Sequence, residues 1–340
     1  MLGKKSTIMI WLNFSRSLGS IRQMCTKDLR VCLEEKMKAM YQQEQQHKFL
    51  ANKVSIWHVP DNLREVKPRA YDPHFISIGP YNHGSSTLQG SERLKWLSLN
   101  RLVDSGEQTG VELHNLIAAL QDIEDDARAC YSEDIKLSKD EFVKMMLLDG
   151  CFIIDLFRDL KLNNFACSSL LSKRWILSVV RRDLITLENQ LPMIVLRKLF
   201  AVRRKSTPEL LLEELALRFF DPLMPRSPDI LRQSINSTIE GSHQHNFKHL
   251  LDLFHSSISL RKVKRCKEPH MYWSVSELKE VGVKVRVLGN SQPLELKFER
   301  GVLEMPRLQI NDHTNSFFRN IVAYEQCHQG CKPDVTTYTH

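Results

Sequence analysis

One apolar stretch that a proline interrupts places the strongest constraint on how this chain can fold. Between Arg181 and Phe200 apolar residues recur near helical spacing, so one face of a helix is predicted to be buried. The residues of that face are Leu184, Leu187, Leu191, Ile194 and Val195. Pro192 lies inside the face and cannot donate a backbone hydrogen bond to the carbonyl of Glu188. We therefore expect a kinked core helix at this point.

The polar residues before this proline allow two interpretations. Glu188, Asn189 and Gln190 can satisfy the backbone acceptor that Pro192 leaves, or they can form a ligand site. Buried polar groups almost always have a hydrogen-bond partner within the protein, which favours the structural role. The chemistry of this segment does not by itself define a function.

Helical periodicity dominates from Glu92 to about residue 260. Ser138 and Glu141 have the spacing of a capping box directly before the apolar run Phe142–Phe157, which predicts a central helix. Within that run, Asp149-Gly150 indicates a close contact between helices rather than a catalytic acid. Further helix starts are predicted near Asp28, at the capping boxes of Ser206 and Ser274, and near Thr314. The helix of residues 28–40 is expected to pack, or to pair with a partner helix.

A segment rich in proline and glycine, from Val59 to Gly84, breaks this pattern near the N-terminus. We expect no helix within it, because proline disrupts the helical hydrogen-bond ladder. Ile76 and Ile78 alternate with Ser77, which favours a short strand or an extended arm that ends at Gly79-Pro80.

Apolar and charged residues alternate in the C-terminal part of the chain. Two alternating runs, 283–287 and 294–298, predict half-buried strands joined by turn residues, and 302–310 predicts an edge strand that Pro306 interrupts. The predicted fold class is therefore α+β and predominantly α-helical, with a multi-helix core and a small antiparallel sheet near residues 283–310. Residues 221–242 contain three prolines and are predicted to be an exposed loop or a boundary.

Composition and charge disfavour several classes of protein. The net charge of +8 is concentrated in residues 1–60, which hold ten basic and four acidic residues and so carry +6, leaving +2 for the remainder. The basic runs lack interleaved aromatic residues, so no nucleic-acid partner is predicted. The eight cysteines have no framework spacing, which is typical of reduced thiols.

No apolar run is long enough to cross a membrane. Residues 1–27 contain no acidic residue and are predicted to be a disordered or targeting-like extension, followed by one mainly helical domain over residues 28–340.

Motifs of catalysis and metal binding are incomplete. Gly79 and Gly84 have phosphate-loop spacing without the following lysine, and the pair His245 and His249 lacks the intervening glutamate of a zinc protease. Cys327-His328-x2-Cys331 offers three soft ligands without a second cluster. We therefore predict no catalytic residue, no cofactor and no metal site.

Five ordered motifs nevertheless resemble a plant-specific family, domain of unknown function 247. They are Val59-Pro60 with Tyr71-x-Pro73, Ile76–Tyr81 with His83-Gly84, Leu148–Phe152, Asp183-Leu184 with Leu187–Pro192, and Arg319-Asn320 with Ala323–Cys327. The motifs extend over residues 59–327, most of the chain. Asn82 stands where the family usually has a histidine. The resemblance implies a C-terminally truncated member, which is expected to end before the family's remaining helices and membrane anchor.

The resemblance implies candidate residues and a general function. The candidate interaction residues are Tyr71, Pro73, Gly79, Pro80, His83, Gly84, Asp149, Gly150, Glu188, Asn189, Gln190, Pro192, Arg319, Asn320, Glu325 and Gln326. We expect a non-enzymatic interaction or recognition protein with a protein partner, contacted through Tyr71–Gly84 and Glu188–Gln190. It is expected in the cytoplasm or peripheral to a membrane, since membrane association is implied by the family alone. The alternative is an enzyme with a site formed by His83, Asp149, Glu188 and Glu325.

Overall fold

The structure is a computed structural model, and it describes nine ranges of the chain. They are residues 29–38, 40–41, 53–103, 112–162, 174–203, 211–242, 246–259, 274–328 and 335–336. The chain divides into two compact units, residues 1–53 and residues 54–340.

In the first unit, residues 29–38 and 40–41 are helical, as the apolar spacing predicts. The apolar stripe of this helix is exposed: Leu29, Leu33, Met37 and Met40 all face solvent. The helix is therefore confirmed, and its packing or pairing with a partner helix stays a prediction.

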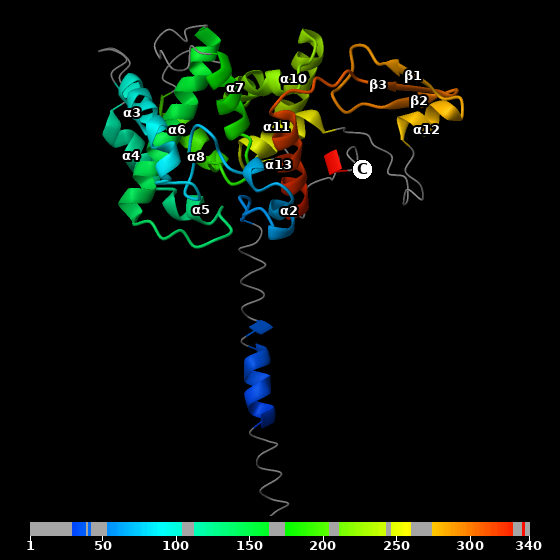
Figure 1. The fold of residues 1–340 in the computed structure, drawn as a ribbon. Helices are drawn as coiled ribbons and strands as arrows, with labels where there is room; N and C mark the ends of the chain where they lie inside the picture. The colour runs from blue at the N-terminus through cyan, green and yellow to red at the C-terminus, as the bar shows by residue number, and fades with distance from the viewer. Residues whose placement is uncertain are drawn as a thin grey trace, which may run out of the picture. The chain divides into compact units, whose positions relative to one another are not determined.

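The second unit is predominantly helical, which confirms the predicted fold class (Figure 1). Its helices before the sheet are α2 (Asp61–Val66), α3 (Gln89–Val103), α4 (Leu113–Gln121), α5 (Glu124–Arg128), α6 (Lys139–Leu162), α7 (Arg174–Asp183), α8 (Met193–Arg203), α9 (Leu212–Phe220), α10 (Pro228–Ser242), α11 (Leu250–Ile258) and α12 (Val275–Glu280). The strands β1 (Lys284–Val287), β2 (Lys297–Glu299) and β3 (Val302–Met305) follow, and then α13 (Thr314–Cys327). Short 3-10 turns lie at Pro68–Ala70, Ser86–Leu88 and Asp221–Leu223.

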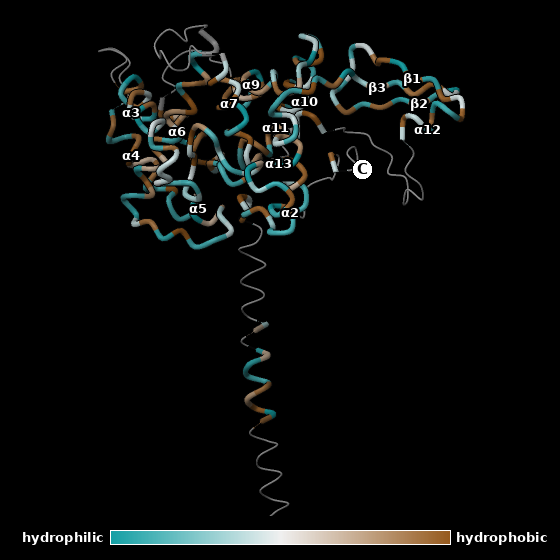
Figure 2. The backbone as a smooth tube through the Cα atoms, in the orientation of Figure 1, coloured by the Kyte–Doolittle hydropathy of each residue, from teal (hydrophilic) through white to brown (hydrophobic). Residues whose placement is uncertain are grey.

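Helix α6 is the centre of the helical core. It contacts α3, α4, α8 and α9, and its hydrophobic residues continue along most of its length (Figure 2). Its start is the predicted capping box, because the N–H of Ser138 donates to Glu141 and the N–H of Glu141 donates to the Ser138 hydroxyl. A Cβ added to Gly150 would lie 2.3 Å from Cδ1 of Leu199 on α8. The close helix contact predicted from Asp149-Gly150 is therefore present.

The kinked helix expected across Pro192 is wrong. Helix α7 ends at Asp183 and α8 begins at Met193, and residues 184–192 form turns between them. Side chains within this connection bind nearby carbonyls and compete with the helical ladder: Thr186 donates to Arg182, and Gln190 donates to Leu184 and Thr186. Pro192 then precedes the first turn of α8, a position that proline tolerates.

Two other segments are more helical than their sequences predict. Residues 221–242, expected to be an exposed loop or a boundary, contain α10, which packs on α9 and α11. Pro228 is the first residue of α10. The N–H groups in the first turn of a helix have no acceptor within the helix, so a proline at this position removes no helical hydrogen bond. Likewise α2 fits between Pro60 and Pro68, so the expectation of no helix within 59–84 is wrong for these six residues.

The small sheet is present at the expected residues, with a different order of strands. Strand β3 lies between β1 and β2, so the run expected to be an edge strand is the central one. It pairs antiparallel with β2, as predicted, and parallel with β1. A parallel pairing needs a longer connection than a hairpin, and residues 288–301, which contain β2, provide it. Strands β1 and β2 are mostly exposed instead of half-buried, whereas β3 is half-buried along its whole length.

Candidate functional site

Most of the candidate residues gather around one extended segment, residues 69–79, which we call the arm. The arm leads from the turn after α2 to Gly79 and contains no regular strand. An extended segment inside a helical core has no neighbouring strand to bind its backbone, so its N–H and C=O groups need other partners. Six side chains provide them, and we call these the clamp: Asp149, Arg182, Asp183, Ser316, Asn320 and Asn189.

Asp183, the last residue of α7, binds the middle of the arm. Its carboxylate accepts hydrogen bonds from the N–H groups of His74 at 3.0 Å, Phe75 at 2.7 Å and Ile76 at 3.0 Å. Arg182 donates to the same carboxylate at 3.0 Å. Burial raises the pKa of the Asp183 carboxyl, and the hydrogen bonds from the arm oppose that rise. This carboxylate therefore has no face left for a substrate.

Asn189 binds the next part of the arm, from Ile76 to Ile78. Its amide nitrogen donates to the carbonyls of Ile76 and Asp183, both at 3.0 Å, and its amide oxygen accepts from the N–H of Ile78 at 2.8 Å. The side chain is fully buried. The asparagine thus binds the arm in the manner of a neighbouring β-strand.

The end of the arm is bound by a buried ion pair. Oδ2 of Asp149 accepts from the N–H of Gly79 at 2.8 Å, and its Oδ1 lies 2.7 Å from Nζ of Lys95 on α3. Both side chains are 1% exposed. Burial acts to lower the pKa of Lys95, but the attractions of Asp149 and of Glu92, whose carboxylate lies 2.6 Å from the same Nζ, together outweigh it and raise that pKa. Burial also raises the pKa of Asp149, against the opposing effect of Lys95.

Gly79 is required at this position for two reasons. Its φ of +74° lies in the left-handed region, which side chains disfavour. A Cβ at Gly79 would also lie 2.5 Å from the carbonyl oxygen of Gln190 and 3.1 Å from the hydroxyl of Tyr131. That hydroxyl donates to the same carbonyl at 3.1 Å, so the backbone of the arm passes directly over the α7–α8 connection.

The start of the arm is bound from α7 and α13. Nη2 of Arg182 donates to the carbonyls of Arg69 and Ala70, both at 3.2 Å. Asn320 and Ser316 on α13 also donate to the carbonyl of Ala70. The amide oxygen of Asn320 accepts from the N–H of Leu187 at 2.9 Å. Helix α13 is thereby joined to the arm and to the α7–α8 connection at once.

Glu188 binds a neighbouring segment. Its carboxylate accepts from the N–H of Val59 at 2.7 Å and forms an ion pair with Arg64 of α2 at 2.5 Å. His58 lies 3.1 Å from the same carboxylate. The backbone carbonyl of Glu188, which we expected Asn189 or Gln190 to satisfy, instead accepts from the side chain of Asn82 at 3.0 Å.

Glu325 lies in a separate group of contacts. It pairs with His255 of α11 at 2.7 Å and accepts from the N–H groups of Val335 at 2.8 Å and Thr336 at 2.7 Å. Burial acts to raise the pKa of Glu325, but these hydrogen bonds outweigh it and lower that pKa.

The remaining candidates are divided between core and surface. Tyr71, Pro73 and Gln190 are buried, whereas His83, Gly84 and Gln326 are exposed. Pro80 and Arg319 lie between these extremes, and Arg319 donates to Asn315 at 2.7 Å. The expected recognition surface at Tyr71–Gly84 and Glu188–Gln190 is therefore mostly interior. The amide of Asn189 binds the arm, and the amide of Gln190 binds the backbone of Leu184, Thr186 and Leu251.

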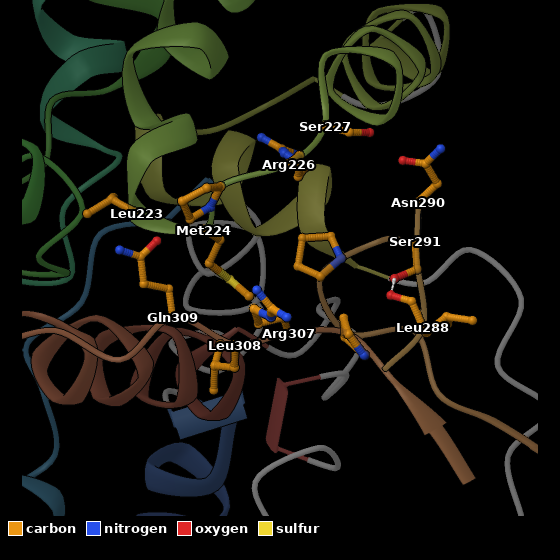
Figure 3. Close-up of a pocket in the computed structure, with 13 residues that line it drawn as sticks. Leu223, Met224, Arg226, Ser227, Leu288, Asn290, Ser291, Arg307, Leu308 and Gln309 are labelled. Atoms are coloured by element: carbon orange, nitrogen blue, oxygen red, sulfur yellow. Dashed lines mark hydrogen bonds between the residues drawn. The ribbon is translucent and has the colours of Figure 1, made fainter. Parts of the chain in front are cut away.

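A cavity of about 170 Å³ lies between the segment before α10 and the segments that flank the sheet (Figure 3). Its lining is provided by residues 223–227 and 306–309, together with Leu288, Asn290, Ser291 and Pro293. None of the candidate residues lines it. Arg226 provides a buried charge there, but it donates to Asp221 at 3.0 Å and to the hydroxyl of Ser234 at 2.9 Å. The cavity therefore does not gather the residues that the alternative enzyme hypothesis requires.

The motifs that suggested metal or nucleotide binding either have structural roles or include residues that the structure does not describe. His249 is the N-cap of α11, where Nδ1 accepts from the N–H of Asp252 and Nε2 contacts the carbonyl of Ser55 at 3.0 Å. Burial lowers the pKa of His249 to about 4. His245, Cys331 and the Ser206 capping box lie outside the described residues. Within the described ranges no three His, Cys, Asp or Glu side chains are grouped to hold a metal ion.

Sequence analysis did not mark Arg182 and Ser316, which belong to the clamp, or Lys95, which pairs with Asp149. Lys95, Arg182 and Ser316 are conspicuous only once the fold is known. A carboxylate such as Asp149 inside an apolar helix does imply a buried cation, but the sequence does not indicate which cation. In the described part of the chain, no helix combines the length and the hydrophobicity that crossing a membrane requires.

The fold and the clamp define a mainly helical protein whose marked polar residues bind its own backbone. Residues 56–340 match the family DUF247, plant proteins of unknown function, and the chain belongs to this family. It is similar to a UPF0481 protein of Arabidopsis thaliana, with 30% identity over 83% of this chain and 63% of that protein. A second UPF0481 protein of the same plant is 29% identical over 60% of this chain and 37% of its own length. The chain thus spans less than two thirds of either relative. No solved structure matches it.

Proposed function

We propose that this protein is a non-catalytic interaction or recognition protein whose partner is another protein. The observation that supports this most is the use of the clamp residues. A general acid, base or nucleophile needs at least one polar atom that can reach a substrate. Asp149, Asp183 and Asn189 instead direct their polar atoms at Lys95, at Arg182 and at the backbone of the arm.

The four residues of the alternative enzyme hypothesis have separate surroundings. Asp149 pairs with Lys95, Glu188 with Arg64, and Glu325 with His255. His83 is exposed on the surface. Catalytic sets act through mutual hydrogen bonds around one reacting atom, and no hydrogen bond or ion pair joins any two of these four side chains in the described structure. This separation favours binding over catalysis.

The proposed contact surface is the turn Pro80–Gly84, which directly follows the arm. Its backbone is irregular, and its side chains are bound from behind. Tyr81 donates to the carbonyl of Ile56 at 3.1 Å, and Asn82 donates to Glu188 at 3.0 Å. His83 and Gly84 face solvent. A rigid, irregular backbone with exposed polar groups is suited to specific recognition, so the clamp would serve to fix the shape of this turn.

Site-specific photocrosslinking in plant cells tests this proposal. A photoreactive amino acid is placed at His83 and, as a matched exposed control, at Asp134. We expect a discrete crosslinked protein from position 83 and not from position 134, and excess unmodified protein should compete it away. Equal crosslinking from both positions, or none from position 83, would contradict the proposed surface.

A second measurement tests catalysis directly. The protein is incubated with a plant metabolite extract, and the extract is followed by mass spectrometry over time. We expect no compound to be consumed in proportion to protein concentration. Consumption that Glu188→Gln or Asp149→Asn abolishes, with the fold retained by circular dichroism, would overturn the proposal in favour of an enzyme.

A further inference from the structure

The three-stranded sheet has two outer strands, β1 and the shorter β2. The order β1-β3-β2 places β2 on the outside, with β3 on its inner side only (Figure 1). Edge strands expose backbone donors and acceptors that another strand can bind. The residues of β2 are Lys297, Phe298 and Glu299, and all three are exposed.

The hairpin between β2 and β3 determines which backbone groups point outward. Its two-residue loop is Arg300-Gly301, with φ values of +50° and +74°, as expected for the tight turns of β-hairpins. In such a hairpin the flanking residues, here Glu299 and Val302, form a hydrogen-bonded pair. The next pair, Phe298 and Leu303, is not hydrogen-bonded, because the two kinds of pair alternate. The N–H and C=O of Phe298 therefore point away from the sheet.

The side chains of this edge also divide into two faces. Phe298 is opposite Leu303, which is opposite Val285, so these three form one apolar row across the sheet. Phe298 is 65% exposed, and Leu296 and Val287 on the same face are 49% and 62% exposed. Lys297 and Glu299 project from the opposite, charged face.

We propose that β2 pairs antiparallel with β2 of a second copy of this chain, around a twofold axis at Phe298. In that register Phe298 is opposite Phe298 of the copy, and the two residues exchange both backbone hydrogen bonds. Lys297 of each copy is opposite Glu299 of the other. Two opposite-charge pairs and one aromatic pair stabilise the contact, and the two sheets become one sheet of six strands.

The charges of Lys297 and Glu299 also explain why we expect β2 to pair with a second copy of this chain and not with an unrelated strand. A lysine on a short edge strand normally discourages pairing with unrelated strands. The sequence Lys-Phe-Glu is complementary to itself in antiparallel register, so its charges favour pairing with an identical strand. Three residues bury far less area than a permanent dimer interface. The dimer is therefore weak and depends on protein concentration.

Charge exchange at the two positions tests the register. Lys297→Glu and Glu299→Lys each place like charges opposite one another in a homodimer, and an equimolar mixture of the two variants restores both opposite-charge pairs. Sedimentation of the full chain over a concentration series should show dimerisation of the unmodified protein. Each single variant should weaken it about tenfold or more, and the mixture should regain it.

Each result decides the proposal. An unmodified protein that is monomeric at all attainable concentrations would overturn it. So would a dimer that neither variant weakens, which would indicate another surface, such as the exposed helical stripe of residues 29–41. Weakening without recovery in the mixture would also refute the antiparallel register, provided that circular dichroism melting shows both variants folded. The double variant, Lys297→Glu with Glu299→Lys, is the matched control and should dimerise like the unmodified protein.

Discussion

Asp183 binds Ile76 across 107 residues of sequence: its Oδ2 lies 3.0 Å from the backbone nitrogen of Ile76. The same carboxylate also accepts from His74 and Phe75. One side chain therefore satisfies three consecutive donors that have no strand beside them. The stability of the arm should depend strongly on this residue.

Asp183→Asn tests that dependence. The amide keeps one acceptor oxygen but loses the charge that binds three N–H groups and Arg182. We expect the free energy of unfolding to fall by about 3 kcal/mol, since buried donors and a buried cation lose their partner. Urea unfolding measures the change. Asp134→Asn, on the exposed surface, is the control and should change it by less than about 0.5 kcal/mol.

Gly79 and Gly84 form a matched pair for the next prediction. Both have positive φ, at +74° and +76°, but a Cβ at Gly79 would meet Gln190 whereas a Cβ at Gly84 would meet nothing within 4 Å. We expect Gly84→Ala to cost about 1 kcal/mol from backbone strain alone. Gly79→Ala should cost at least about 3 kcal/mol, because the arm must also move. If melting experiments show that Gly79→Ala and Gly84→Ala lose the same stability, the arm does not approach Gln190 as closely as the structure indicates.

Asn189 and Asn82 distinguish the arm from the turn that follows it. Asn189 makes three hydrogen bonds to buried backbone groups, and Asn82 makes one, to Glu188. Asn189→Ala should reduce the free energy of unfolding by about 3 kcal/mol or more, and Asn82→Ala by about 1 kcal/mol. Chemical denaturation of both variants measures this order. The reverse order would mean that the carbonyl of Glu188 is the more important acceptor.

His249 should make stability depend on pH. Its pKa in the folded protein is about 4, below the ordinary histidine value of 6.5. As pH falls below 6.5 the unfolded chain binds a proton that the folded protein does not, so the free energy of unfolding decreases. The loss should approach about 3 kcal/mol between pH 6.5 and pH 4. Above pH 6.5 this contribution is fully present.

His249→Asn separates this effect from other titrating groups. Asparagine is also a good N-cap, so helix α11 should persist while the titration disappears. Denaturant unfolding at pH 7 and at pH 4.5 should then show a smaller difference than in the unmodified protein. An unchanged difference would assign the pH dependence to other groups.

Local signals in the sequence predicted the helices well where side chains interact with near neighbours. The capping boxes at Ser138 and Ser274 mark true helix starts, because both partners lie within one turn. The stripe of Phe317, Ile321 and Tyr324 likewise places α13 correctly, since all three are buried. The sheet also lies at the residues where apolar and charged side chains alternate in the sequence. Periodicity and capping are short-range properties, and one sequence contains them completely.

The clamp could not be predicted, because its partners are backbone groups far away in the chain. Asn189 and Gln190 looked available for a ligand, and every hydrogen bond that the structure gives these two side chains is to backbone. The same limitation explains the error at residues 184–192. The apolar spacing there is helical, but Asn320 binds Leu187 from α13 and stabilises a turn. The predicted order of the strands was wrong for a related reason, because the order depends on which strand pairings the segments between the strands allow.

The contact between Asn320 and Ala70, 250 residues apart, constrains the order of events during biosynthesis. Chains grow from the N-terminus and usually begin to fold in that order. The arm is among the first described segments of the large unit to leave the ribosome, yet its carbonyls acquire their last partners only when α13 has been translated. Until then the carbonyl of Ala70 lacks its partners on α13 and can bind water instead, so the start of the arm reaches its final hydrogen bonding only after 250 further residues have been added.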